Sequence, residues 1–139
     1  MADLKRLCRH AAEMLEQCQE VTIASVDESG FPRICVVSPI RREGYGVVYF
    51  ATSVNSQKVR QFRCNKKAGL CYYHNNNSQT LTGTVDILED VATKKALWQN
   101  WMLRHFPLGP EDPDYCVVKF TGKTATLWYE GEFETFEVE

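Results

Sequence analysis

The chain has 139 residues, which is enough for one domain with a sizeable buried core. Hydrophobic residues make up 44% of it and charged residues 24%, as in ordinary globular proteins, while a net charge of -2 and a pI near 5.9 exclude the basic surface of a nucleic-acid-binding protein. No apolar run approaches the roughly 20 residues that cross a bilayer, and the first residues lack a signal-peptide core. We therefore expect a single domain over residues 1–139, cytoplasmic and without membrane contact.

Residues 4–18 place apolar side chains at helical spacing with charges between them, which predicts an amphipathic opening helix. Residues 21–26 and 31–40 are then predicted as strands joined by a turn at 27–30. A glycine-containing turn leads to a further strand that begins at Val47. The chain to this point is a helix followed by a meander of strands.

The second half continues with a helix after Thr52 that ends near residues 65–67, and with strands at 70–74 and 79–88. Helical periodicity returns over residues 89–106 and predicts a third helix.

The proline-rich segment 107–113 forbids continued helix and predicts a rigid loop. Strands at 115–121 and 124–129 follow, joined by a tight hairpin at Gly122-Lys123. The acidic tail, residues 130–139, either adds an edge strand or frays.

About six or seven strands in consecutive hairpins with three flanking helices predict a mainly β, mostly antiparallel fold that curls into a barrel. The helices do not alternate regularly with the strands, which disfavours a parallel α/β architecture. The glycine-rich dinucleotide and nucleotide phosphate motifs and the G-x-S-x-G motif of hydrolases are absent from the sequence.

The six cysteines form no C-x-x-C pair, and in a chain without a signal peptide we interpret them as reduced, mostly buried small hydrophobes. The histidines, His10, His74 and His105, are scattered without neighbouring ligands at a zinc-like spacing. We therefore expect no metal site.

The most informative stretch is residues 49–58, where a strand passes through small polar residues into a helix. Asn55 or Ser53 is the expected helix cap, with Ser56, Gln57 and Lys58 in the first turn. A helix start attracts anions, so the hydroxyl and the ammonium there make a candidate phosphate clamp. A capped surface helix with a solvated lysine is the alternative.

Taken together, these segments resemble the pyridoxamine 5′-phosphate oxidase-like, FMN-binding split-barrel superfamily, and most closely its general-stress-protein branch. The resemblance covers nearly the whole chain. It is carried by residues 32–37, by Tyr49-Phe50-Ala51-Thr52 with Ser56-Gln57-Lys58, by residues 81–85, and by the pattern F-P-x-G-P-x-D-P-x-Y at 106–115.

The resemblance implies an FMN split barrel, a homodimer with the cofactor at the subunit interface, and an arginine, Arg33, that reaches the flavin phosphate. Two cations and a hydroxyl on one phosphate monoester are chemically consistent with that role. The cofactor-binding residues that it implies are Arg33, Val36, Ser38, Phe50, Thr52, Ser53, Ser56, Gln57 and Lys58.

Two departures bear on the activity. Gln57 and Ser38 stand where the true oxidase has an arginine and a lysine, and the acidic tail contains no arginine to grip a phosphorylated substrate. We therefore do not expect pyridoxamine phosphate oxidation.

The leading hypothesis is an FMN-dependent oxidoreductase that passes hydride through flavin N5 between a small-molecule substrate and a partner such as a nicotinamide. A nitroimidazole-type reductase on the same fold is one alternative. A binding protein for FMN, a deazaflavin or haem, without turnover, is the other. No side chain is an evident catalytic acid or base. Tyr49, His74 and Trp128 are interpreted as packing residues, and Trp98 and Trp101 as core or dimer contacts rather than flavin-stacking ones.

Overall fold

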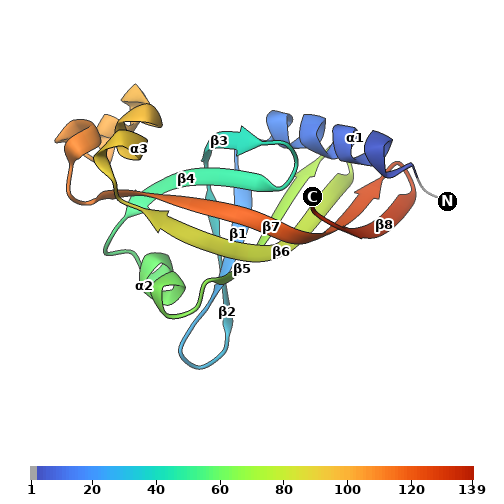
Figure 1. Ribbon diagram of the computed structural model, residues 1–139, viewed down its shortest axis with the longest axis horizontal. Coiled ribbons are helices and arrows are strands. Elements are labelled where there is room, and N and C mark those ends of the chain that lie inside the picture. The colour runs from blue at the N-terminus through green and yellow to red at the C-terminus, as the bar shows by residue number, and fades with distance from the viewer. Residues whose placement is uncertain (1–2) are drawn as a thin grey trace.

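A computed structural model describes residues 3–139 and shows a single antiparallel sheet with helices packed against it (Figure 1). The elements in chain order are α1 (Leu4–Gln17), β1 (Val21–Val26), β2 (Pro32–Val37), β3 (Pro39–Glu43), β4 (Val47–Ser53), α2 (Gln57–Cys64), β5 (Lys67–His74), β6 (Asn77–Leu88), α3 (Val91–Ala96), the 3-10 helices η1 (Asn100–Arg104) and η2 (Gly109–Glu111), β7 (Tyr115–Tyr129) and β8 (Glu132–Glu137). The predicted mainly β class is confirmed.

The strand order explains why the sheet curls. Seven strands follow the order β2-β1-β5-β6-β7-β4-β3, and β8 pairs with β7 beside β4. The two edge strands of that order, β2 and β3, are separated in sequence by Ser38 alone. The sheet must therefore bend round until its edges come close, which produces a half-barrel with a seam at Ser38.

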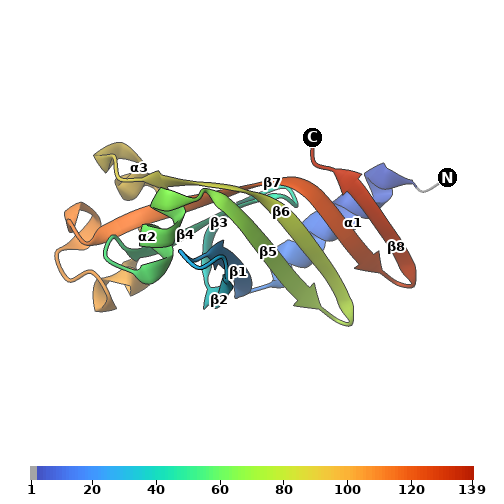
Figure 2. The same ribbon diagram turned by 90° about the horizontal axis from the view of Figure 1, so that it is seen from below.

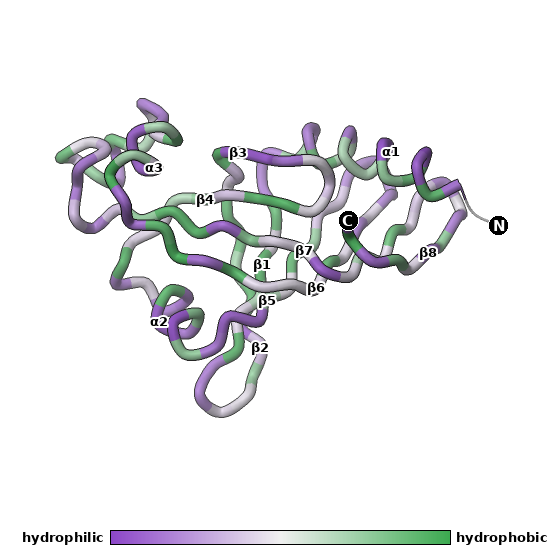
Figure 3. Tube along the Cα trace, in the orientation of Figure 1, coloured by the Kyte–Doolittle hydropathy of each residue, from purple (hydrophilic) through white to green (hydrophobic). Residues whose placement is uncertain are grey.

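The large core lies between α1 and the sheet. Asp3 caps α1 by accepting a hydrogen bond from the backbone nitrogen of Arg6 at 3.1 Å. The helix then buries one face, and its trace alternates between hydrophobic and hydrophilic residues in Figure 3. Its partners come from strands that alternate buried and partly exposed positions. The fully or nearly buried members include Leu7, Ala11, Leu15, Ile23, Phe50, Val59, Phe62, Leu70, Leu81, Val85, Phe120 and Leu127.

A small core lies at the opposite end of the molecule, where α3, η1 and η2 gather (Figure 1). Its buried members are Ile40, Met102, Phe106, Tyr115 and Val117. Figure 2 shows β7 running from this end to the end where β8 lies, so one strand contributes to both cores.

The predicted hairpin at Gly122-Lys123 is wrong, because β7 is one continuous strand of 15 residues. The register of β6 against β7 shifts here, and Gly83 pairs with Gly122. A Cβ atom on Gly83 would lie 2.1 Å from the Thr121 carbonyl oxygen. These glycines therefore allow two strands to approach closely at a bulge rather than turn the chain.

The continuous helix predicted over residues 89–106 is also wrong. α3 ends after six residues, the backbone of Gln99 is extended, and the chain resumes as a 3-10 helix. The Gln99 side-chain amide donates to the Ile40 carbonyl oxygen at 3.1 Å, and Met102 turns into the small core. A contact with a distant strand overrides the local periodicity.

The number of strands, the acidic tail and the cysteines can also be compared with the sequence predictions. The predicted second strand is split at Ser38 into β2 and β3, and this gain offsets the fusion of the strands predicted at 115–121 and 124–129 into β7. The acidic tail does form an edge strand, β8, which brings the number of strands to eight rather than six or seven. All six cysteines are free thiols; Cys18 and Cys116 are buried and Cys64 is exposed. Within residues 3–139, no helix is long and apolar enough to cross a membrane.

Candidate functional site

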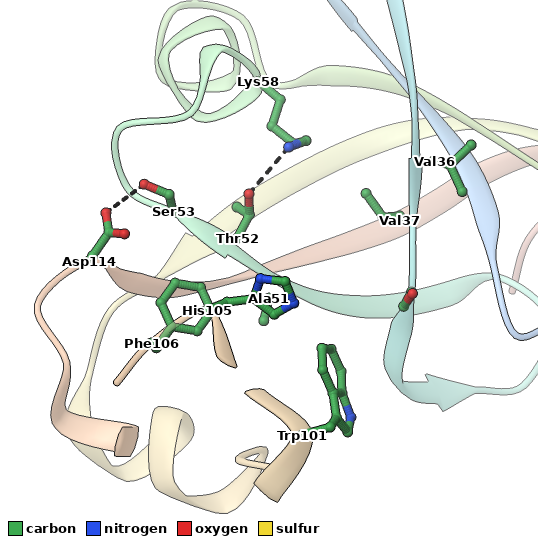
Figure 4. A pocket seen from close by; sticks show the side chains of 11 residues that line it. Val36, Val37, Ala51, Thr52, Ser53, Lys58, Trp101, His105, Phe106 and Asp114 are labelled. Atoms are coloured by element: carbon green, nitrogen blue, oxygen red, sulfur yellow. Dashed lines mark hydrogen bonds between the residues drawn. The ribbon is translucent and has the colours of Figure 1, made fainter. Parts of the chain in front are cut away.

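A cleft of about 390 Å³ opens at the seam of the half-barrel (Figure 4). This volume lies within the range of small-molecule sites. The end of β2, the end of β4, the start of α2 and the η1 region each contribute to its lining. The lining residues are Val36, Val37, Ser38, Ala51, Thr52, Ser53, Lys58, Trp101, His105, Phe106 and Asp114.

The start of α2 supplies the cation of this cleft. The Lys58 ammonium donates to Thr52 Oγ1 at 3.2 Å, and the Thr52 hydroxyl donates to Ser56 Oγ at 3.5 Å. Ser56, rather than Asn55 or Ser53, is the N-cap residue, since its Oγ accepts from the backbone nitrogen of Val59 at 3.4 Å. The predicted cap is thus corrected by one to three residues, while Lys58 does lie in the first turn, where the helix dipole is positive.

Arg33 lies in a second hollow of about 250 Å³, which Lys58 also lines together with Gln57. The Arg33 guanidinium donates to Gln57 Oε1 at 3.0 Å. In the part of the chain that the structure describes, neither Arg33 nor Lys58 has a carboxylate ion-pair partner. Two cations without carboxylate partners among residues 3–139 therefore lie beside a helix start, in the hollow that Gln57 also lines.

The proline-rich loop positions the other side of the cleft. Asp112 is buried and accepts hydrogen bonds from the backbone nitrogens of Leu108 and Asp114. The Asp114 carboxylate in turn accepts from the Ser53 hydroxyl at 2.5 Å, and its carbonyl oxygen accepts from the Val54 backbone nitrogen at 2.8 Å. The loop is thereby tied to the turn that leads into α2.

Buried groups below the cleft hold their protons. Burial raises the pKa of the Cys116 thiol to about 11 and that of Tyr115 to about 12. The Cys116 thiol contacts the Thr52 carbonyl oxygen at 3.5 Å. A protonated, fully buried thiol is not a nucleophile, so Cys116 has a packing role.

Trp101 and His105 form an aromatic wall that the sequence did not assign to the site. Their rings meet edge to face, with centroids 6.1 Å apart and planes 82° apart. Figure 4 shows both side chains projecting into the cleft from the η1 side. Trp98, in contrast, is half-buried and packs edge to face on Tyr115 at 5.5 Å. The core role expected for the two tryptophans therefore holds for Trp98, whereas Trp101 faces the cleft.

The structure brings most of the predicted cofactor residues together. Val36, Ser38, Thr52, Ser53 and Lys58 line the cleft, and Arg33 and Gln57 line the adjoining hollow. Ser56 supports Thr52 from the helix cap. Phe50 is not brought to the cleft, because its side chain is fully buried in the large core.

The residues that sequence reasoning missed are Val37, Ala51, Trp101, His105, Phe106 and Asp114. Signals were available for three of them, since Val37 and Ala51 lie in the segments that carry the resemblance and Phe106 opens the pattern at 106–115. Asp114 occupies an unspecified position of that pattern. Among residues 3–139, no group of three or more His, Cys, Asp or Glu side chains gathers as a metal site would require.

A comparison with sequence families gives a match to the family described as "Pyridoxamine 5′-phosphate oxidase like" over residues 13–137. The chain belongs to this pyridoxamine 5′-phosphate oxidase-like family. No curated protein sequence matches the chain.

Solved structures agree with this family. A Clostridium acetobutylicum protein related to general stress protein 26 is 26% identical, with a TM-score of 0.86 and 96% of each chain covered. A pyridoxamine 5′-phosphate oxidase-related, FMN-binding protein from Nostoc punctiforme is 14% identical, with a TM-score of 0.70, 100% of this chain covered and 98% of that one. A haem-binding protein from Mycobacterium smegmatis is 13% identical, with a TM-score of 0.71, 94% of this chain covered and 57% of that one. The fold is therefore the split barrel of this family.

On the side opposite α1, one face of the sheet is not covered by another element of residues 3–139. Cross-strand partners lie on the same face, so the register places one row of residues across β2, β1, β5, β6, β7 and β8. That row is Val36, Thr22, Cys71, Thr80, Thr126 and Thr135.

We call this surface the outer face and include the rows on either side. Its apolar members are well exposed: 71% for Ile34, 64% for Val36 and 63% for Phe133. The outer face therefore combines exposed apolar side chains with a row of threonines. The outer face begins at β2, which also lines the cleft.

Proposed function

We propose that this chain is an FMN-binding flavoprotein that acts as an oxidoreductase on a small molecule. The observation that carries the proposal is the pair of cations, Arg33 and Lys58, that lack carboxylate partners among residues 3–139 and flank the start of α2. The membership of the family supports FMN over other phosphate esters.

The donor set fits the phosphate of FMN. Arg33 offers a planar fork for two phosphate oxygens, Lys58 a compact positive charge, and the α2 start its free backbone N–H groups. The Gln57 amide adds a neutral donor where the oxidase has an arginine. This set has fewer cations than that of the oxidase, so binding of FMN is expected to be correspondingly weaker.

The shape of the site supports the same ligand. Extended chain runs from Arg33 in β2 to Ser38 just after it, a length of about 17 Å for five residues at ~3.3 Å per residue. Lys58 lines both the hollow at Arg33 and the cleft at Ser38, so the two are adjacent. Arg33, Gln57 and Lys58 would hold the phosphate, and Val36, Val37 and Ser38 would run beside the ring. Bound FMN supplies hydride transfer in two-electron steps.

We further propose a homodimer formed through the outer face. The exposed Ile34 and Val36 are continuous with the cleft, so a second copy would cover the apolar face and border the cofactor. Sedimentation of Ile34→Asp against the wild type tests this. The variant is expected to be monomeric, and an unchanged dimer would refute the assignment of this face.

Two features argue against pyridoxamine phosphate as the substrate. The acidic tail forms β8 on the second half of β7, from Thr124 to Tyr129, whereas the cleft lies at the first half. The tail also carries no arginine. The tail of the same chain therefore offers no cation to a substrate phosphate.

The first test is the visible spectrum of the freshly purified protein, followed by release and mass measurement of any bound molecule. A flavin spectrum with the mass of FMN is expected. A haem band would instead favour a haem-binding function, and a colourless protein that ignores added FMN would refute the flavoprotein. Reduction of the bound flavin by NADH or NADPH, with and without an electron acceptor, then separates an enzyme from a storage protein.

The second test assigns the phosphate site. The double variant Arg33→Ala, Lys58→Ala removes two charge-assisted contacts worth about 1.5–3 kcal/mol each, so FMN should bind about a hundredfold more weakly or worse. Arg60→Ala is the matched control, because Arg60 is a cation of the same helix that lines neither the cleft nor the hollow at Arg33. Equal FMN affinity in the two proteins would remove Arg33 and Lys58 from the site.

A further inference from the structure

We propose that Trp101 and His105 form the substrate wall of the cleft, and that His105 gives a proton to the oxygen of a planar conjugated carbonyl compound bound against Trp101. This inference rests on the proposed flavin function and names the substrate class of the same site. It assigns roles to two residues of η1 and its C-terminal cap that are not part of the proposed cofactor set.

Trp101 is held as a platform. Its side chain is exposed by 44%, yet its indole N–H donates to Gln99 Oε1 at 2.6 Å. The Gln99 amide in turn donates to the Ile40 carbonyl oxygen at 3.1 Å, which connects the indole to β3 across the seam. A large apolar ring that is fixed by hydrogen bonds but left uncovered is suited to stacking against a flat ligand.

The His105 ring lines the cleft without a hydrogen-bond partner among residues 3–139. Its backbone N–H donates to the Met102 carbonyl oxygen, whereas within residues 3–139 its ring nitrogens have no hydrogen-bond partner. Four other polar side chains of the cleft are paired with each other, as Lys58–Thr52 and Ser53–Asp114. Imidazole is the side chain that ordinarily gains and loses a proton near neutral pH, so a free one in a cleft is suited to proton transfer.

The charges of the cleft select an acceptor oxygen rather than an amine. The one carboxylate that lines it, Asp114, already accepts the Ser53 hydroxyl and so is not free to pair with an amine. An N–H donor on the His105 ring instead favours an oxygen that becomes negative during the reaction. A carbonyl conjugated to a flat ring, as in a quinone, has that oxygen and the ring for Trp101.

Reduction of a quinone with His105 as the proton donor balances in electrons and protons. Reduction of a quinone to a hydroquinone takes two electrons and two protons, of which bound FMN would supply both electrons and one proton as hydride. The second proton leaves a ring nitrogen of His105 as the new O–H bond forms. Solvent then returns a proton to the imidazole, because the His105 side chain is exposed.

The first experiment measures a single turnover. The FMN-loaded protein is reduced anaerobically with light and EDTA, then mixed with duroquinone, whose fully methylated ring does not alkylate the cysteines. Reoxidation is followed by the visible flavin band. Ferricyanide, which takes electrons without a proton, serves as the second acceptor.

In His105→Gln, we expect the ratio of the duroquinone rate to the ferricyanide rate to fall about a hundredfold. His74→Gln is the control, since His74 lies at the end of β5 and does not line the cleft. An unchanged ratio in His105→Gln would overturn the role of His105.

The second experiment needs no flavin. Duroquinone is titrated into the apoprotein while tryptophan fluorescence is recorded. Saturable quenching is expected in the wild type and in Trp98→Phe, and its loss is expected in Trp101→Phe. Saturable quenching that survives in Trp101→Phe would overturn the wall.

The two failures are distinguishable. A protein that takes up no FMN in any variant refutes the proposed function, and the apoprotein titration still reports on Trp101. A protein that binds FMN normally, but whose acceptor ratio and quenching ignore both substitutions, refutes this inference alone.

Discussion

The large core and the small core are held together by different kinds of interaction. The large core packs the periodic apolar face of α1 and two side chains of α2 against alternating strand positions, and the buried Gln79 that bonds to Tyr72 within it is neutral. The small core is packed beside a buried lysine, Lys94, and a buried aspartate, Asp112. Lys94 donates to the Asp112 carbonyl oxygen at 2.9 Å, and the Tyr115 hydroxyl donates to the Lys94 carbonyl oxygen at 3.0 Å.

This difference distinguishes the part of the molecule that stabilises the sheet from the part that positions the wall of the cleft. Apolar burial is non-directional and stabilises the whole sheet, whereas a few directional contacts hold the wall that faces the cleft. The large core should therefore set the global stability, and the small core should set only the local order of η1 and its loops.

The largest effect is expected from Leu127→Ala in the large core. Leu127 is 1% exposed, and a Leu→Ala change in a well-packed core costs about 3–4 kcal/mol. Chemical denaturation should show this loss in the free energy of unfolding, with a single cooperative transition. A loss below about 1 kcal/mol would mean that the large core does not dominate stability.

Met102→Ala is the counterpart in the small core. Met102 is 0% exposed, so a cavity costing about 2–3 kcal/mol is expected. Amide hydrogen exchange should speed up over residues 99–112 while the β6–β7 amides keep their protection. Equal loss of protection along β6 and β7 would show that the two cores unfold as one unit.

Lys94→Met tests the polar contacts beside the small core. The substitution keeps the apolar stem but leaves the buried Asp112 carbonyl oxygen without its donor, at a cost of about 2 kcal/mol. Lys95→Met is the matched control, because the adjacent Lys95 is 55% exposed and pairs with Glu111 at 3.5 Å on the surface. Amide hydrogen exchange over residues 99–112 should be faster in Lys94→Met and almost unchanged in Lys95→Met.

The smallest effect concerns pH. Burial raises the pKa of the Cys116 thiol from 9.0 to about 11, so the folded state binds this proton more tightly than the unfolded state. Its stabilisation is complete below about pH 9 and is lost as the pH rises toward about 11. Denaturation across this range should show a decline that is shallower in Cys116→Ala by about 1–2 kcal/mol. Parallel declines would exclude Cys116 as a contributor.

The sequence predicts the large-core elements well for a physical reason. The spacing of Leu7, Ala11 and Leu15, and the alternation from Gln79 to Ile87, express burial against one neighbouring surface. The same reasoning fails at Gly122, where glycine serves a close approach between strands, and at Gln99, where a bond to Ile40 ends the helical path. Those causes lie in residues distant along the chain.

The candidate site likewise contains residues that are close in the sequence and residues that only the fold brings together. Lys58, Thr52 and Ser53 belong to one local strand-to-helix segment, and the structure brings them together in the cleft. Trp101, His105 and Asp114 reach the same cleft only because the small core folds against β4 and β7. Periodicity assigns such residues to a helix face or a loop, and their shared position appears only in three dimensions.

The position of β7 in the chain has a consequence for synthesis. This strand, residues 115–129, pairs with β6, β4 and β8, so β4 and β6 cannot meet through it until β7 itself has left the ribosome. A nascent chain that has emerged only as far as Asp114 carries both strands as open edges, which are prone to pair with other chains. The sheet therefore closes only after β7 has emerged, and protection of those two edges by a chaperone would matter most just before that point.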